Sequence, residues 1–332
     1  MPGVQTRNDD MYRMLRTVSR TFALSIEQLP PVLRDAVTLA YLLFRVADCI
    51  EDHPGLSREH KAGLLRLWAH ILAGKAPVGS LIGAIQALDA DDPEVKVAQS
   101  ADLLIERMHG LPDEPVRILA DHVQATALGM ARWQDHGPFV RDEPEMDDYM
   151  HEVAGRVGYL LTDIFCWYAP AIRRLRNLLM PLAREFGLAL QTVNIIRGMR
   201  KDYERGWVFV PETLYTAEGL TRDGLFDPRN NIRALRVVAT LADKARRHLQ
   251  SGLMYITLLP RIERRIRLFC IWPLLFAAKT LAVSCDNPAV LSAEAKISRR
   301  QVGAIVFYSR MLAWSNTCLR AYFHTLLKPV RV

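Results

Sequence analysis

Helical periodicity runs along the whole chain and limits the folds open to it. Apolar residues recur at steps of three and four, which places them on one helix face, and we find no sustained period-two alternation bounded by turn signals. Prolines separate the periodic segments, where a missing N–H disturbs a helix least. The sequence predicts an all-α fold, with helices over about 9–27, 32–52, 57–73, 94–110, 114–135, 145–169, 171–201, 230–258, 261–283 and 293–326. Residues 75–93 and 203–229 are the longest predicted connections.

Length and composition indicate a compact globular protein. The 332 residues include no long polar linker, so we expect one domain over residues 1–332. The first ten residues lack the apolar core of a signal peptide, and the longest apolar tract, Leu268 to Ala278, is shorter than the roughly 18 to 20 residues that a membrane span needs. We therefore expect a buried core helix there, no transmembrane anchor and a cytoplasmic protein. The five cysteines show no paired metal spacing, which favours free buried thiols.

The net charge of +7 attracts anions such as nucleic acid, anionic lipid headgroups or phosphorylated substrates. The basic clusters at 173–176 and 261–267 lie in helical patterns, without interleaved exposed aromatics or a known nucleic-acid module. We therefore expect no nucleic-acid partner. Peripheral association with an anionic membrane remains open, and solvated helix faces are the commonest explanation of such clusters.

One helical stripe begins apolar and ends acidic. Its members step by three or four along the predicted helix over 32–52: Leu33, Val37, Tyr41, Phe44, Asp48 and Asp52. An ionised group is strongly penalised in an apolar interior unless it is paired or bound to metal, so the helix is expected to open into a polar cavity. Asp48, Glu51 and Asp52 would direct oxygens to one spot, as Mg²⁺ requires. A solvated acidic helix end is the alternative, although the macrodipole disfavours acids at a C-terminal end.

A second polar stripe, Gln191, Asn194, Gly198 and Asp202, follows an apolar start in the predicted helix over 171–201. Two such helices facing each other would suit a diphosphate bridged by Mg²⁺, since this ion typically uses one or two carboxylates together with substrate phosphates and water. The basic residues beside the stripes could hold phosphate oxygens directly: Arg45, Arg197, Arg200 and Lys201. Ordinary ion pairs on helix surfaces are the alternative.

Between the two stripes, residues 149–158 read Tyr-Met-His-Glu-Val-Ala-Gly-Arg-Val-Gly. Small residues at 154, 155 and 158 allow close approach of a neighbouring backbone or a ligand, despite the cost of Gly in a helix. Packing with a satisfied hydroxyl is the common fate of a tyrosine such as Tyr149. His151 has no metal partner at i+4 and is expected to be structural or exposed.

Together these segments resemble the squalene and phytoene synthase family of head-to-head prenyl transferases. The resemblance covers most of the chain, through Ser19-Arg20-Thr21-Phe22-Ala23, Tyr41-x-x-x-Arg45-x-x-Asp48-x-x-Glu51-Asp52, Tyr149-x-His151-x-Val153-Ala154-Gly155-x-Val157-Gly158 and Gln191-x-x-Asn194-Ile195-Ile196-Arg197. Two distal segments resemble the squalene synthase branch: Phe269-Cys270-x-x-Pro273 and Lys296-Ile297-x-Arg299-x-Gln301. The resemblance implies a helical bundle around a central cavity.

The family's activity implies two farnesyl diphosphates condensing to presqualene diphosphate, followed by reduction with NADPH to squalene. By resemblance, the expected metal-site residues are Asp48, Glu51, Asp52 and Asp202, and the expected substrate contacts are Ser19, Arg20, Phe22, Tyr41, Arg45, Gln191 and Arg197. Tyr149 is the expected proton-transfer group and Phe269 the aromatic facing the carbocation. Asn194, Lys296 and Arg299 are placed near NADPH. No GxGxxG motif accompanies them, so no Rossmann unit is predicted.

The chain departs from the family pattern in its second acidic motif. That motif normally reads Asn-x-x-Arg-Asp-x-x-x-Asp, and here Gly198 stands at the first aspartate, so that Asp202 alone remains. Alternatives therefore stay open: a synthase that stops at presqualene diphosphate or a hydroxylated product, a phytoene-synthase-like enzyme, or a non-catalytic protein that binds prenyl diphosphates.

Overall fold

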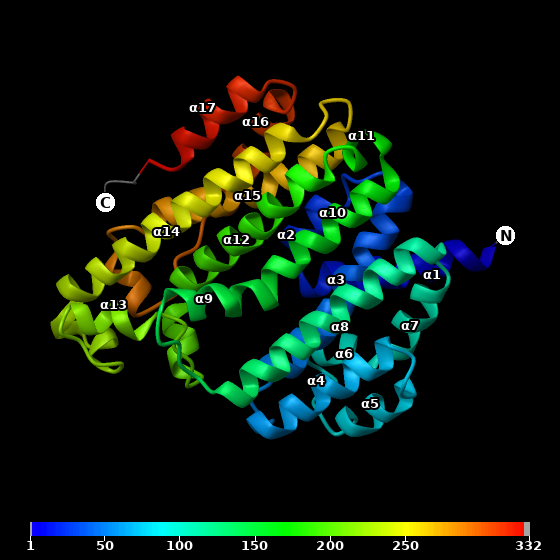
Figure 1. Cartoon of the computed structure of the whole chain (residues 1–332), viewed down its shortest axis with the longest axis horizontal. Coiled ribbons are helices and arrows are strands. Elements are labelled where there is room, and N and C mark those ends of the chain that lie inside the picture. The colour runs from blue at the N-terminus through cyan, green and yellow to red at the C-terminus, as the bar shows by residue number, and fades with distance from the viewer. Residues whose placement is uncertain (1, 329–332) are drawn as a thin grey trace. The chain divides into compact units, whose positions relative to one another are not determined.

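The computed structural model describes the backbone of residues 2–328 and the side chains of residues 9–328, and over this range the protein is all-α (Figure 1). A parallel bridge between Phe139 and Val208 is the only strand-like pairing in the described range. The predicted fold class is confirmed.

The chain divides into two compact units, of which the first takes residues 2–137 and 159–176. Its helices are α1 (Pro2–Val18), α2 (Arg20–Ile26), α3 (Pro31–Asp52), α4 (Arg58–Leu72), α5 (Val78–Ile85), α6 (Pro93–Gln99), α7 (Ala101–His109), α8 (Asp113–His136), most of α10 (Arg156–Tyr168), and α11 (Pro170–Arg173).

The second unit takes residues 138–158 and 177–328. It contains α9 (Glu143–Met150), a π-helical turn (His151–Gly155), α12 (Arg176–Glu204) beyond its first residue, α13 (Glu212–Ala217), α14 (Asn231–Leu258), α15 (Arg264–Ser284), α16 (Arg299–Leu312), α17 (Asn316–Leu326) and short 3₁₀ turns at Gly224–Phe226, Pro228–Asn230 and Pro288–Leu291. The expectation of a single domain stays a prediction.

Several predicted helix boundaries are wrong, and capping side chains explain some of the breaks. Ser19 interrupts the helix predicted over 9–27, because its Oγ accepts a hydrogen bond from the Phe22 N–H and starts α2. Ser298 starts α16 in the same way, so the helix predicted over 293–326 begins later, and it is divided again at Ser315. The helix over 94–110 divides at Ser100, and that over 145–169 contains the π-helical turn. The connections predicted over 75–93 and 203–229 contain α5 and α13.

In the first unit, α3 carries the central apolar stripe and the structure confirms its predicted gradient. Leu33, Val37 and Phe44 are buried, whereas Asp48 is half-buried and Asp52 is exposed. Elsewhere in this unit, Trp68 of α4 and Trp133 of α8 are almost fully buried. The apolar part of α3 therefore lies in the core and its last turn reaches solvent.

The core helix of the second unit is α15, as predicted for Leu268 to Ala278. Ile271, Trp272 and Leu274 are fully buried, and the Trp272 Nε1 donates to Ser309 Oγ of α16 at 2.8 Å. Within the described range, α15 is the one helix long and apolar enough to cross a membrane, but 83% of its apolar window is buried inside the protein. The cysteines are free, and Cys318 is exposed, unlike the other four.

A buried guanidinium joins the ends of four helices in this unit. Arg267, fully buried near the start of α15, donates to the Ile256 and Leu259 carbonyl oxygens at 2.7 Å and to Asn316 Oδ1 at 2.7 Å. It also donates to the Ala313 carbonyl at 3.3 Å. Carbonyl groups at helix C-termini carry partial negative charge, so they stabilise this cation without a carboxylate. The contact fixes α14, α16 and α17 to the base of α15.

Glycines allow α12 to pack directly against the segment that follows α9. A Cβ added at Gly158 would lie 2.1 Å from the Ala183 carbonyl oxygen, and one at Gly187 would lie 2.3 Å from the Ala154 carbonyl oxygen. Real side chains do not approach backbone this closely, so only glycine fits at either position. The close approach expected from residues 154–158 is thus to a neighbouring backbone, that of α12.

We expect Gly158→Ala and Gly187→Ala each to lower the free energy of unfolding by about 2 kcal/mol or more, because the new methyl group must push two helices apart. Urea denaturation monitored by circular dichroism measures this loss. Gly63→Ala is the matched control, since no atom lies within 4 Å of its added Cβ. That substitution in α4 should be neutral or stabilising by up to about 1 kcal/mol. Wild-type stability in Gly158→Ala would contradict this packing.

Candidate active site

Arg45 lies at the centre of the polar end of α3. Its Nη2 donates to the Tyr41 hydroxyl at 2.7 Å, and its Nη1 lies 3.1 Å from Glu94 Oε1 and 3.7 Å from Asp48 Oδ2. Phe22 extends this cluster, with its ring centroid 5.5 Å from that of Tyr41. Four of the predicted site residues, Phe22, Tyr41, Arg45 and Asp48, are thus brought together in the first unit. The fifth member, Glu94 of α6, was not predicted.

The Asp48 carboxyl group is held in a setting that disfavours its charge. Burial is the main cause and raises its pKa to about 6; Arg45 opposes the shift, while Asp52 and Glu94 add to it. The Asp48 side chain nevertheless remains 35% exposed, so solvent can reach it. A cation bound at this point would relieve the repulsion among these carboxylates.

The donor set at the end of α3 fits a hard divalent cation that is shared with a ligand. Asp48 and Asp52 are one helical turn apart, with Glu51 between them in sequence. Within residues 9–328, no three His, Cys, Asp or Glu side chains are arranged to hold a metal by themselves. Mg²⁺ is usually bound by one or two carboxylates together with phosphate oxygens and water. An open pair of carboxylates therefore suits Mg²⁺, whereas an ion coordinated entirely by protein groups would need more ligands.

Ser19 and Arg20 occupy different settings beside this cluster. Ser19 Oγ is engaged as the N-cap of α2, which gives it a structural task. Arg20 is exposed and lines an open pocket of about 560 Å³ together with Arg13, Arg16, Tyr12, Asp9 and Thr17. Three guanidinium groups around one pocket can donate hydrogen bonds to phosphate oxygens. Arg13 and Arg16 are ion-paired with Asp10 and Glu27, so the local positive charge is partly balanced.

Tyr149 is buried at the end of α9 and lies in an aromatic stack. Its ring centroid is 4.3 Å from that of Phe209, at an interplanar angle of 14°, and Phe209 stacks in turn on Trp207 at 5.3 Å. The π-helical turn begins two residues after Tyr149, and such turns are frequent at functional sites. The stack fixes the orientation of the Tyr149 phenol ring, and this orientation serves both a packing role and a proton-transfer role.

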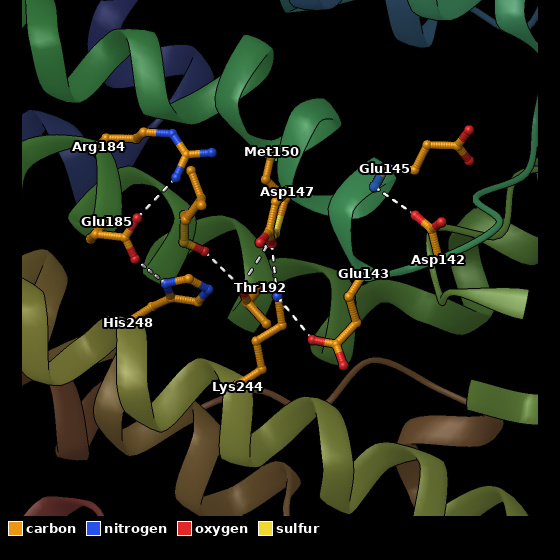
Figure 2. A network of polar contacts seen from close by, with 11 residues as sticks. Asp142, Glu143, Glu145, Asp147, Met150, Arg184, Glu185, Thr192, Lys244 and His248 are labelled. Atoms are coloured by element: carbon orange, nitrogen blue, oxygen red, sulfur yellow. Dashed lines mark hydrogen bonds and ion pairs between the residues drawn. The ribbon is translucent and has the colours of Figure 1, made fainter. Parts of the chain in front are cut away.

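A polar network fixes α9 to α12 and α14 (Figure 2). Lys244 of α14 is almost buried and contacts Glu143 at 3.0 Å and Asp147 at 2.8 Å, both on α9. On α12, Thr192 Oγ1 donates to Leu188 O and contacts Met150 Sδ of α9. A further pair, His248 Nδ1 and Glu185 Oε2 at 2.6 Å, joins α14 to α12. The hydrogen bond from His248 is the main reason that the pKa of Glu185 lies below its usual value. The network sets the positions of Tyr149 and of the α12 residues that follow.

The predicted polar face of α12 is present, and an unpredicted carboxylate links it to the segment before α16. Gln191 and Asn194 contact each other at 3.5 Å, and Arg197 Nε lies 3.2 Å from Glu294 Oε1. The other oxygen of Glu294 lies 2.6 Å from Lys296 Nζ. Burial raises the pKa of Glu294, but the hydrogen bond from Lys296 and the charge of Arg197 outweigh this and hold the pKa below its usual value. The structure therefore brings the predicted phosphate contact Arg197 and the predicted cofactor contact Lys296 together.

The remaining predicted residues of the second unit lie at three places. Asp202, near the end of α12, is paired with Arg205 at 2.7 Å. Arg299 is exposed and begins α16, where Ser298 and Gln301 form a capping box that explains the Gln301 of the motif. Phe269 is buried in α15. On α12, an added Cβ at Gly198 would meet only Asp202 Oδ2, at 3.8 Å, so this part of the helix has room for a larger side chain.

Comparison with known proteins accounts for this combination of features. The profile of the squalene/phytoene synthase family matches residues 15–301, which include the acidic end of α3, Tyr149 and the polar face of α12. The chain belongs to the squalene/phytoene synthase family. Curated relatives include squalene synthases from Schizosaccharomyces pombe, 27% identical over 92% of this chain, and Eremothecium gossypii, 30% identical over 95%. A lycopaoctaene synthase from Botryococcus braunii is 27% identical over 96% of this chain.

The matched part of the chain spans 65% of the Schizosaccharomyces relative, 70% of the Eremothecium relative and 68% of the Botryococcus relative. Among solved structures, a complex of TcSQS with the ligand BPH1237 superposes with a TM-score of 0.83, at 23% identity, covering 97% of this chain and 91% of that one. A dehydrosqualene synthase complex gives a TM-score of 0.62 at 15% identity, covering 97% and 98%. These structures support the isoprenoid synthase fold of this family member.

Sequence reasoning missed three residues that organise the site. Glu94 follows Pro93 in the first turn of α6. Acidic residues are common at this position because they interact favourably with the helix dipole, so its presence there gave no sign of a contact with Arg45. Phe209 lies within the connection predicted over 203–229, where helical periodicity gives no information on side-chain placement. Glu294 lies two residues before Lys296, and this proximity to the predicted cofactor segment was the one signal that could have found it.

We expect the raised pKa of Asp48 to appear as a pH dependence of stability. Because the folded-state pKa lies above the unfolded value, ionisation of Asp48 costs folding free energy as pH rises from about 4 to 6, and the cost is complete above pH 6. Solvent screening of the part-exposed group limits it to about 1 kcal/mol. Asp48→Asn should therefore stabilise the metal-free protein at pH 7 by about this amount but not at pH 4. Denaturation at both pH values, in chelator, measures the difference; equal effects at pH 4 and pH 7 would contradict the assignment.

Proposed function

We propose that this protein catalyses the Mg²⁺-dependent head-to-head condensation of two farnesyl diphosphates to presqualene diphosphate, and converts it onward to squalene with NADPH. The observation that carries the proposal is the acidic end of α3, where Arg45 is held between Asp48 and Glu94 in a member of this family. Relatives named squalene synthase, together with the Lys296–Glu294–Arg197 link, support the assignment. The rest of the proposal follows from the chemistry that each residue can perform.

The first step requires that a diphosphate leaves carbon 1 of one farnesyl group. Bound Mg²⁺ would neutralise the departing oxygens, and Asp48 and Asp52 are the residues proposed to hold it, with Glu51 and Asp202 as further oxygen donors. Arg20, Arg45 and Arg197 bind phosphate oxygens. The 2,3 double bond of the second farnesyl diphosphate then attacks that carbon, and a proton is lost as the cyclopropane closes. Tyr149, fixed by its aromatic stack, is the group proposed to transfer this proton.

The second step ionises presqualene diphosphate, and the rearranged cation is reduced. NADPH when bound supplies the hydride. Lys296 and Arg299 carry exposed cationic groups that fit the phosphates of a dinucleotide, and Asn194 is an exposed amide on α12. Phe269 is buried in α15, and an aromatic face screened from solvent can stabilise a carbocation.

Two observations favour alternative outcomes of the same chemistry. Gly198 removes one carboxylate from the second acidic motif, which favours a synthase that releases presqualene diphosphate or a hydroxylated product. The similarity to a protein named lycopaoctaene synthase favours testing longer prenyl diphosphates, as does the family's phytoene synthase branch. A non-catalytic protein that binds prenyl diphosphates is the remaining alternative.

Incubation of the purified protein with farnesyl diphosphate, Mg²⁺ and NADPH, followed by analysis of both hydrocarbons and diphosphates, tests the proposal. We expect squalene, and presqualene diphosphate when NADPH is omitted. Asp48→Asn and Asp52→Asn should each reduce turnover at least about 100-fold, because the metal that stabilises the leaving group is lost.

Asp163→Asn is a control for loss of a carboxylate, since Asp163 pairs with His122 and Arg176 outside the residues proposed for the site. It should change stability more than turnover. Binding of farnesyl diphosphate without any thirty-carbon product would contradict the enzymatic assignment. A forty-carbon product formed in competition with geranylgeranyl diphosphate would favour the phytoene-like alternative.

Gly198→Asp tests the role of the missing carboxylate. The position has room for the new side chain next to Asp202, so the fold should be kept. We expect the restored oxygen ligand to favour the second ionisation and to lower the ratio of presqualene diphosphate to squalene across a Mg²⁺ titration. Gly198→Asn is the matched control of similar volume without charge. An unchanged ratio in Gly198→Asp, or the same change in both variants, would show that charge at this position does not limit the second step.

A further inference from the structure

An exposed apolar surface lies at the C-terminal end of α16, in the second unit. Phe307, Met311 and Trp314 are 63%, 67% and 54% exposed, and their spacing of four and three places them on one side of α16 and its extension. Ile262, in the loop between α14 and α15, is 83% exposed. We call these four residues the α16 apolar surface. Large apolar side chains that gather on a surface indicate an interaction site.

Contacts of Arg264, the first residue of α15, join the end of the preceding loop to α16. Its guanidinium carbon lies 5.0 Å from the centroid of the Trp314 ring, and its Nη2 donates to the Arg310 carbonyl oxygen at 3.1 Å. Ile262 lies two residues before Arg264 in the chain, and Trp272 of α15 is hydrogen-bonded to Ser309 of α16. The start of α15, which begins two residues after Ile262, and the end of α16 are therefore in contact, and α16 is also tied to the middle of α15.

The charges around the α16 apolar surface are strongly one-sided. Glu294 is the last acidic residue of the given sequence, and residues 300–328 contain four basic ones: Arg300, Arg310, Arg320 and Lys328. Arg261 in the loop and Arg265 in the first turn of α15 are both exposed, against a single carboxylate at Glu263. A surface of aromatic and aliphatic side chains bordered by arginines matches the headgroup region of an anionic bilayer, where Trp and Tyr are also favoured.

We propose that this protein binds the surface of anionic membranes through the α16 apolar surface, with Phe307, Met311, Trp314 and Ile262 inserted at the level of the headgroups. The surrounding arginines contact lipid phosphates, while their aliphatic stems lie along the apolar boundary. This mode differs from a membrane span, because α15 stays buried in the core. The basic border of this surface matches an anionic partner better than a neutral apolar one. A second copy of the chain is a poorer match, because it would bring arginines of like charge together.

Vesicle sedimentation tests the proposal without any need for turnover, so its outcome is separate from that of the proposed function. The full chain is mixed with vesicles of phosphatidylcholine containing phosphatidylglycerol and with vesicles of phosphatidylcholine alone. We expect binding to the anionic vesicles, weaker binding to the neutral ones, and loss of the difference at high salt. The double variant Phe307→Ser with Met311→Ser should weaken binding at least about tenfold. Arg261→Glu with Arg265→Glu should weaken it by about 25-fold or more, since each arginine contributes roughly fivefold.

Two similarly exposed isoleucines distinguish binding through this surface from nonspecific adsorption of apolar side chains to vesicles. Ile262 and Ile232 are similarly exposed, at 83% and 75%. Ile262 follows the end of α14, whereas Ile232 lies at the opposite end of that helix and is not part of the α16 apolar surface. Ile262→Ser should weaken vesicle binding, and Ile232→Ser should leave it unchanged. Equal losses in the two variants, or no binding of the wild-type chain to anionic vesicles, would overturn the proposal. A third outcome would also overturn it: a wild-type chain that does not bind vesicles but forms a dimer, which the Phe307→Ser, Met311→Ser variant dissociates. The surface would then join two copies of the chain.

Discussion

Direct contact between backbones in the second unit sets the geometry on which the candidate residues of that unit depend. Gly158 and Gly187 let α12 approach the segment after α9 so closely that carbonyl oxygens occupy the space of missing side chains. Tyr149 lies at one end of this contact and Gln191, Asn194 and Arg197 follow on the other helix, so their spacing depends on it. The π-helical turn at His151–Gly155 lies within the same contact, and Lys244, Glu185 and His248 add polar ties around it.

The cations proposed to bind phosphate are already paired with carboxylates. Arg45 contacts Glu94 and Asp48, and Glu294 contacts both Arg197 and Lys296. Long basic side chains lose rotamer freedom when they are held in one place, so these carboxylates reduce the entropy cost of binding an anion. They also make the site sensitive to the balance of charge, because an arriving diphosphate must exchange with, or share, the existing partners. Partial exposure of these groups keeps that exchange possible.

Basic residues lie in different surroundings in different parts of the chain. Those near α3 and α12 lie beside carboxylates that hold them in position, whereas those around the α16 apolar surface border exposed aromatic and aliphatic side chains. The net charge alone could not separate these uses. A buried cation such as Arg267 represents a third use, in which helix C-terminal carbonyls replace a counter-charge and fix α14, α16 and α17 to α15.

The sequence by itself determined the all-α class, the buried role of α15 and the apolar-to-acidic gradient of α3, because helical periodicity and burial are local properties of the residue order. The ordered motifs also identified the family that the comparisons confirm. The tertiary structure alone decided that Glu94 pairs with Arg45, that Glu294 links Arg197 to Lys296, and that Phe209 stacks on Tyr149. It also decided that Phe307 and Trp314 are exposed near Arg264, whereas the sequence suggested basic clusters without exposed aromatics. These contacts join residues from different helices, and the helical period determines which face a residue lies on but not which element packs against that face.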